Sequence, residues 1–116
     1  PTTNNGKFDV VLGDLDGQSC SRDFLAVIDS AFKDAGLRVA HNDPYKGAQL
    51  TRTFGQPAQG SESLQIEISK GLYLKDDLIT LDRDKFLKLQ AILEAVVRMA
   101  AGYVAVQLSK TSAKVD

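Results

Sequence analysis

One carboxylate in this chain, Glu67, occupies a position that can support acid–base chemistry. It lies between Ile66 and Ile68, in a segment where apolar and polar residues alternate, so its side chain is expected on the face opposite to theirs. A carboxylate on a strand inside a sheet must be paired or hydrated in a cleft. Such a group can serve as a general base or acid, whereas periodicity alone favours an ordinary solvent-facing strand residue.

A second group of polar side chains gathers in the turn at residues 42–47. Pro44 fixes the backbone there, so the turn is rigid and can direct Asn42, Tyr45 and Lys46 at a ligand. By spacing alone, a plain surface turn is the more common outcome.

Three further residues, Arg52, His41 and Cys20, have side chains that can bind a ligand or a metal ion. Arg52 follows the same turn, and its planar guanidinium can hold a carboxylate by two parallel hydrogen bonds, although a lone arginine is most often a solvated cation. A zinc site needs three or four protein ligands, and His41 and Cys20 are the chain's one histidine and one cysteine. We therefore interpret Cys20 as a buried small residue and do not take His41 as a metal ligand.

The first half of the chain predicts a strand, a helix and a second strand. Residues 8–12 form a short apolar run, and Ser21 is placed to cap a helix that runs to about residue 35 and ends at Gly36. Residues 37–40 read as the next strand. This order implies a right-handed crossover and a parallel pair.

The second half predicts a long functional loop at 42–60, a strand at 64–68 and a long helix. Thr80 or Asp82 is expected to cap this helix, and we expect the helix to be buried against a sheet. Residues 1–6 and 109–116 are expected to fray. Its apolar stripe comprises Phe86, Leu89, Leu93, Val96, Ala100 and Tyr103, widened by Leu87, Ile92 and Val97.

Composition narrows the class of protein. The chain has 116 residues and a formal net charge of −1, which suits one domain and indicates no nucleic-acid or membrane-surface partner. A single cysteine excludes a disulfide framework and fits a reducing compartment, so we expect a cytoplasmic protein. Charged and polar residues interrupt the apolar stretch at 95–108, which therefore predicts a buried helix and no membrane span.

Several motifs in register resemble one family, the N-formylglutamate amidohydrolases. The resemblance covers nearly the whole chain and implies an α/β fold with a mostly parallel or mixed sheet and flanking helices, part of a zinc-carboxypeptidase-like (phosphorylase/hydrolase-like) fold. Gly47-Ala48 and Ser69-Lys70 depart from the family's usual Gly-Gly and Asn-Arg. The matching segments are Val11–Asp14 with Gly17 and Cys20, His41–Gly47, Thr51–Pro57, Leu64–Ile68 and Leu72-Tyr73.

The resemblance implies a zinc enzyme that hydrolyses N-formyl-L-glutamate to glutamate and formate in histidine degradation. Glu67 matches the family's strand glutamate and would act as general base, while Asn42, Tyr45, Lys46 and Arg52 would bind the substrate. The resemblance also implies that Gln65 orients the site. Residues 1–116 would be the C-terminal portion of one amidohydrolase domain, with the zinc ligands in the preceding half, so that the isolated chain would be inactive.

Two other functions remain open at this level. The chain can be a non-catalytic α/β binding or interaction domain, or part of a related zinc hydrolase that acts on another N-acyl amino acid. If a preceding half is absent, we expect an unusually apolar surface where it would pack, and self-association through that surface is then possible.

Overall fold

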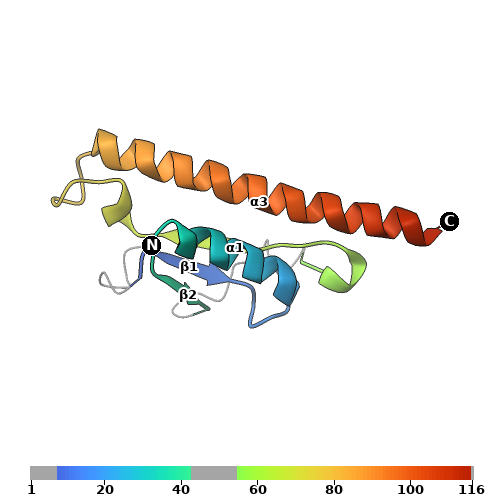
Figure 1. The fold of residues 1–116 in the computed structure, drawn as a ribbon. Coiled ribbons are helices and arrows are strands. Elements are labelled where there is room, and N and C mark those ends of the chain that lie inside the picture. The colour runs from blue at the N-terminus through green and yellow to red at the C-terminus, as the bar shows by residue number, and fades with distance from the viewer. Residues whose placement is uncertain (1–7, 43–54, 116) are drawn as a thin grey trace.

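The computed structural model describes residues 8–42 and 55–115, and of residues 111–115 the backbone only. Its centre is a three-stranded sheet in the order β2-β1-β3 (Figure 1). Strand β1 (Val10–Gly13) pairs in parallel with β2 (Val39–His41) and antiparallel with β3 (Gln65–Ile68). The predicted parallel pair is therefore confirmed, and the sheet is mixed.

Helix α1 (Arg22–Asp34) forms where the capping signals predict it. The hydroxyl of Ser21 accepts a hydrogen bond from the backbone N–H of Phe24 at 3.1 Å, which satisfies one of the free donors of the first turn. Gly36 follows the helix with φ +86°, a left-handed conformation that suits glycine. Ile28 and Phe32 are buried on the inner side of the helix.

Helix α3 (Arg83–Val115) is the long helix that the sequence predicts, and it extends past the end of the predicted apolar stripe. Of the two expected caps, Asp82 is the one used, since its carboxylate accepts from the backbone N–H of Lys85 at 3.1 Å. The helix continues to Val115, since no glycine or proline interrupts residues 109–115, and the fraying expected for residues 109–116 stays a prediction.

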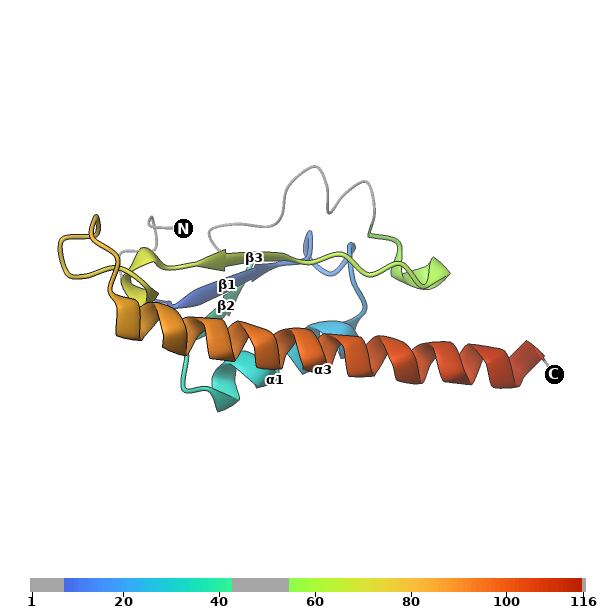
Figure 2. The same ribbon diagram turned by 90° about the horizontal axis from the view of Figure 1, so that it is seen from above.

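Both helices cover the same face of the sheet (Figure 2). Val10 and Leu12 of β1 point to this face and pack with Ile28, Phe32 and Val96 in one apolar core. The expectation that the stripe of α3 is buried holds along its inner side and is wrong on both flanks. There, Phe86, Leu87 and Val97 are 43%, 48% and 66% exposed, because only one side of α3 contacts α1 and the core.

Much of α3 is exposed and apolar, whereas the sequence predicts a buried helix and no membrane span at 95–108. Within the described residues, the segment Arg83–Lys110 is long and apolar enough to cross a membrane by length and composition alone, and little of it is buried. The mostly buried core helix of a soluble protein passes the same test of length and composition.

Candidate active site

Glu67 lies in the middle of β3, opposite Val11 of β1. The alternation of the strand places its side chain on the face of the sheet that the helices do not cover, since Ile66 and Ile68 pair with the core-facing residues Leu12 and Val10. The residue is half-buried. The structure therefore confirms the predicted orientation of this carboxylate.

Gln65 holds the carboxylate of Glu67 from the same face of β3. Its side-chain amide donates to Glu67 Oε1 at 3.0 Å. Because the side chains of residues i and i+2 of a strand project from the same face, this contact is available without any distortion of the backbone. Gln65 therefore binds one oxygen of Glu67, and its role in orienting the site stays a prediction.

Asn42 directly follows β2, and its side chain forms hydrogen bonds to the loop after β1. Its amide oxygen accepts from the backbone N–H groups of Asp14, at 3.0 Å, and of Asp16, at 3.4 Å. Its amide nitrogen donates to Asp14 Oδ1 at 2.7 Å, and Gly17 donates its backbone N–H to the same oxygen at 3.0 Å. The structure thus gives the Asn42 amide a structural role, and its substrate-binding role stays a prediction.

The loop after β1, residues 14–19, also lies close to Gly55. A Cβ placed on Gly55 would lie 2.3 Å from the carbonyl oxygen of Ser19, so only glycine fits at this point. Ser19 is fully buried, and its hydroxyl donates to the carbonyl of Ser63 at 2.8 Å. The loop at 14–19 therefore contacts the described chain on both sides of the segment that carries the predicted binding residues.

Glu62 fixes the segment that leads into β3 to the start of α1. Its two carboxylate oxygens accept from the backbone N–H of Ser21 at 2.8 Å and from the Ser21 hydroxyl at 2.7 Å. The same hydroxyl lies 3.2 Å from the hydroxyl of Tyr103, whose ring packs edge-on against Phe24. A carboxylate at a helix N-terminus also interacts favourably with the helix dipole.

The structure brings three of the six predicted site residues to one end of the sheet. Asn42 follows the residue of β2 that pairs with Leu12, Gln65 pairs with Gly13, and Glu67 lies two residues further along β3. With strands about 4.8 Å apart, Asn42 and Gln65 lie roughly 10 Å from each other across β1. The other three predicted residues, Tyr45, Lys46 and Arg52, lie outside the described residues.

Cys20 is buried as predicted, and His41 contacts a carboxylate of α1. Cys20 is buried, and this burial, with the nearby Asp14 and Glu62 carboxylates, raises the pKa of its thiol to about 12. His41 Nε2 lies 2.7 Å from Asp29 Oδ1. Burial would raise the pKa of Asp29, but hydrogen bonds from His41 and Lys33 outweigh it and lower that pKa.

The described residues contain no group of three or more histidine, cysteine, aspartate or glutamate side chains that could hold a metal ion. This part of the chain therefore does not fit a zinc site by itself.

A family model for N-formylglutamate amidohydrolase matches residues 1–74, well over half of the chain. The chain belongs to the N-formylglutamate amidohydrolase family. The resemblance carried by the motifs at 11–14, 41–47, 51–57 and 64–68 is thereby confirmed. All of these motifs lie inside the matched segment.

A solved member of the amidohydrolase family supports the fold. The N-formylglutamate amidohydrolase from Ralstonia eutropha JMP134 is 34% identical, superposes with a TM-score of 0.75 and matches 86% of this chain. The chain spans only 35% of the length of that protein. No curated protein matches the chain.

Sequence reasoning missed the contacts of two carboxylates, Asp14 beside Asn42 and Glu62 at the start of α1. Asp14 is 3% exposed, yet it reads in the sequence as one more polar residue of a Gly- and Asp-rich loop. Glu62 lies 41 residues from its partner Ser21, so no local pattern links them. The only sequence signal for Asp14 was its place at the end of the Val11–Asp14 motif.

Proposed function

We propose that this chain supplies the general-base and substrate-binding part of an enzyme that hydrolyses N-formyl-L-glutamate to L-glutamate and formate. The observation that carries the proposal is the carboxylate of Glu67, half-buried on the face of the sheet opposite to the two helices and hydrogen-bonded to Gln65. Family membership supplies the reaction, and this geometry supplies a candidate for its base.

Hydrolysis of a formamide requires one proton to move from water to nitrogen. A carboxylate at position 67 takes a proton from the attacking water, whose oxygen bonds to the formyl carbon. The C–N bond then breaks, and the carboxyl group returns the proton to the leaving amine. The hydrogen bond from the side-chain amide of Gln65 to Oε1 helps to hold this carboxylate in place.

The substrate carries two carboxylates that must be held while this proton moves. Arg52 suits one of them by its planar pair of donors, and Tyr45 and Lys46 can donate to the other or to the developing oxyanion. These assignments rest on the motifs at 41–47 and 51–57. Asn42 contributes by fixing the start of that segment to Asp14.

Zinc enters this proposal only through the family resemblance. When bound, it would polarise the formyl carbonyl and lower the pKa of a water. Because the described residues do not form a metal site, we expect its ligands in the portion of the enzyme outside this chain, within a zinc-carboxypeptidase-like fold in the cytoplasm.

A full-length protein that contains this chain provides the test, with formate release as the measurement. Glu67→Gln should lower kcat by about 10²- to 10⁴-fold, because the amide cannot accept the proton. Glu62→Gln is the matched control, since Glu62 is bound to Ser21 at the N-terminus of α1, and it should leave kcat within about threefold.

Two results would contradict the proposal at different levels. If Glu67→Gln kept its kcat, Glu67 would not be the base. If the protein left N-formyl-L-glutamate intact but released the acyl group from another N-acyl amino acid, the substrate assignment would be wrong and the hydrolytic role of Glu67 would stand.

A further inference from the structure

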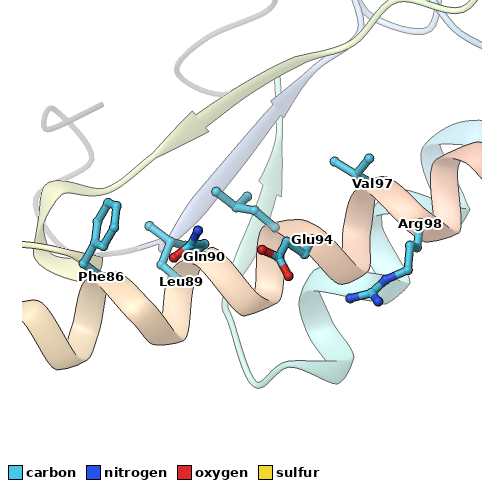
Figure 3. Close-up of a pocket in the computed structure, with 7 residues that line it drawn as sticks. Phe86, Leu89, Gln90, Glu94, Val97 and Arg98 are labelled. Carbon is cyan, nitrogen blue, oxygen red and sulfur yellow. The ribbon is translucent and has the colours of Figure 1, made fainter.

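Two hollows lie beside the first turns of α3, and Leu89 lines both of them. The first is the groove shown in Figure 3, whose charged lining residues, Glu94 and Arg98, have opposite signs. The second has a volume of about 160 Å³, and its two charged lining residues, Lys85 and Lys88, are both positive. We call the second one the lysine hollow, and its charge distinguishes it from the groove.

Three segments of the chain supply the apolar wall of the lysine hollow. Leu37 follows the turn at Gly36 and leads into β2, and Leu72 belongs to the short helix η2 (Lys70–Leu72) that follows β3. Leu89 and Ile92 come from α3. Leu89 is buried, and Leu37 and Ile92 are partly buried and pack against the core. The wall is therefore apolar, and the core holds two of its side chains in place.

Two lysines supply the charge of this hollow. Lys85 is half-buried, and its ammonium group donates to the carbonyl of Leu74 at 3.2 Å, which fixes its position. This contact uses one of the three donors of an ammonium group. Lys88 is exposed and lies three residues further along α3, on the same side of the helix. An anion at the opening of the hollow therefore meets two positive charges.

We propose that the lysine hollow binds a small monocarboxylate with an apolar body of about six carbon atoms. An apolar cavity of about 150 Å³ can hold benzene, so the volume of this hollow suits a group of that size. The leucine and isoleucine side chains of the wall remove the apolar body from water. The carboxylate stays at the opening, where Lys85 and Lys88 lie and water still reaches it.

The lysine hollow lies at the opposite end of the sheet from the candidate active site. Leu37 leads into β2 and η2 follows β3, so both adjoin the end of the sheet at Val10, whereas Gln65 pairs with Gly13 at the other end. The hollow also lies on the helix-covered side, and Glu67 is on the other face. Its ligand is therefore separate from the substrate of the proposed reaction, and either proposal can fail without the other.

The test is a titration of a full-length protein that contains this chain with sodium hexanoate, followed by NMR of the isoleucine methyl groups. We expect the δ1 methyl signal of Ile92, assigned from an Ile92→Val variant, to shift with a Kd on the order of 1 mM, which is typical of so small a ligand. The uncharged analogue 1-hexanol should bind at least about threefold more weakly, because it gains nothing from the two ammonium groups.

Two variants test the charge and the apolar wall separately. Lys88→Glu should weaken hexanoate binding at least about fivefold, whereas Lys110→Glu, the same change on α3 outside the hollow, should leave it unchanged. Gly71 lines the hollow and has a negative φ, and the atom nearest to a Cβ added there is Ser69 Oγ at 3.8 Å. Gly71→Leu should therefore occupy part of the hollow and weaken binding at least about fivefold. Circular dichroism checks that each variant remains folded.

A carboxylate can also bind at the predicted substrate groups, so the variant Arg52→Gln separates the two sites. Unchanged hexanoate binding in Arg52→Gln supports the lysine hollow, and binding lost in that variant would place the carboxylate at the substrate site and overturn the proposal. An Ile92 methyl signal that does not shift up to about 20 mM hexanoate would also overturn it. So would equal affinities for hexanoate and 1-hexanol, or equal losses in Lys88→Glu and Lys110→Glu.

Discussion

At the scale of single residues, the reciprocal pair Asp14–Asn42 explains the start of the predicted binding segment. Asp14 is buried and Asn42 has φ +59°, a left-handed conformation that asparagine tolerates better than most residues. Two backbone donors and one carboxylate oxygen converge on this one amide. Asparagine therefore meets a conformational and a hydrogen-bonding requirement at once.

Two substitutions at Asn42 should separate these requirements. Asn42→Gly keeps the left-handed backbone but removes the amide, and should lower the free energy of unfolding by about 2 kcal/mol, because the buried Asp14 loses the donor and the acceptor that this amide supplies. Asn42→Ala removes both and should cost about 1 kcal/mol more. Urea denaturation of the isolated chain measures both values, and equal stability of the two variants would show that the backbone conformation carries no cost.

Cys20 should make stability depend on pH in the alkaline range. Burial, together with the Asp14 and Glu62 carboxylates, raises its pKa from 9.0 to about 12. The unfolded chain therefore loses the thiol proton above pH 9 while the folded chain keeps it, so stability is full below pH 9 and falls as the pH rises toward 12. The loss is up to about 1.4 kcal/mol per pH unit.

The variant Cys20→Ala is the reference for this effect, since its unfolded state has no thiol to ionise. The difference in free energy of unfolding between the unmodified chain and Cys20→Ala, measured at pH 8 and at pH 10, should shift against the unmodified chain by about 1 kcal/mol. An unchanged difference would mean that the thiol ionises in the folded protein as it does in the unfolded one.

At the scale of elements, one glycine fixes a close approach between two loops. The Cβ of an alanine at position 55 would meet backbone atoms of Ser19, which cannot move aside as a flexible side chain can. Gly55→Ala should therefore lower the free energy of unfolding by about 2 kcal/mol. The same change at Gly102, on α3 with nothing within 4 Å of the new Cβ, should raise it by about 0.5–1 kcal/mol. Thermal denaturation of both variants checks these opposite signs, and a stable Gly55→Ala chain would contradict the close contact.

Local signals at the elements predicted much of this fold. Ser21, Gly36 and Asp82 mark helix boundaries that the sequence predicts, because their roles depend on residues within a few positions. The exposed flank of α3 could not be predicted in the same way. A broad apolar stripe is the same whether one side or three sides of a helix are covered, and only the rest of the fold decides which.

The sequence predicts only part of the candidate site, because it contains local signals and no information on distant contacts. The alternation of β3 placed Glu67 and Gln65 on one face, and the structure confirms it. The bonds of Asn42 to Asp14 and of Glu62 to Ser21 join residues 28 and 41 positions apart, and periodicity contains no information on such pairs. The resemblance to the family identified Asn42 as a motif residue, and the structure adds its structural role.

At the scale of the whole molecule, the chain is more extended than a compact domain of its length. The radius of gyration is 15.6 Å, whereas a compact domain of this length has about 13 Å. The excess comes from α3, which runs past the sheet (Figure 2). A chain that spans about a third of its solved relative and leaves one side of both layers uncovered has the geometry expected of one part of a larger body.

The few possible zinc ligands in this chain lead to a prediction about its zinc content. A zinc site draws three or four ligands from histidine, cysteine and carboxylates, and this chain has one histidine and one cysteine. Cys20 is buried with a raised pKa, and His41 is bound to Asp29 on the helix-covered face, opposite to Glu67. The isolated chain should therefore retain less than about 0.1 zinc per chain in equilibrium dialysis at micromolar zinc.

The same chain should release formate from N-formyl-L-glutamate only at the rate of a buffer blank, because a general base alone contributes about 10²- to 10⁴-fold and has no electrophile to work with. Assembled with the remaining portion of the enzyme, it should gain both zinc and formate release, and Glu67→Gln should abolish the release while leaving the zinc content unchanged. Zinc bound stoichiometrically by the isolated chain would place the metal ligands within these 116 residues, and would contradict the division of the site between two portions of the enzyme.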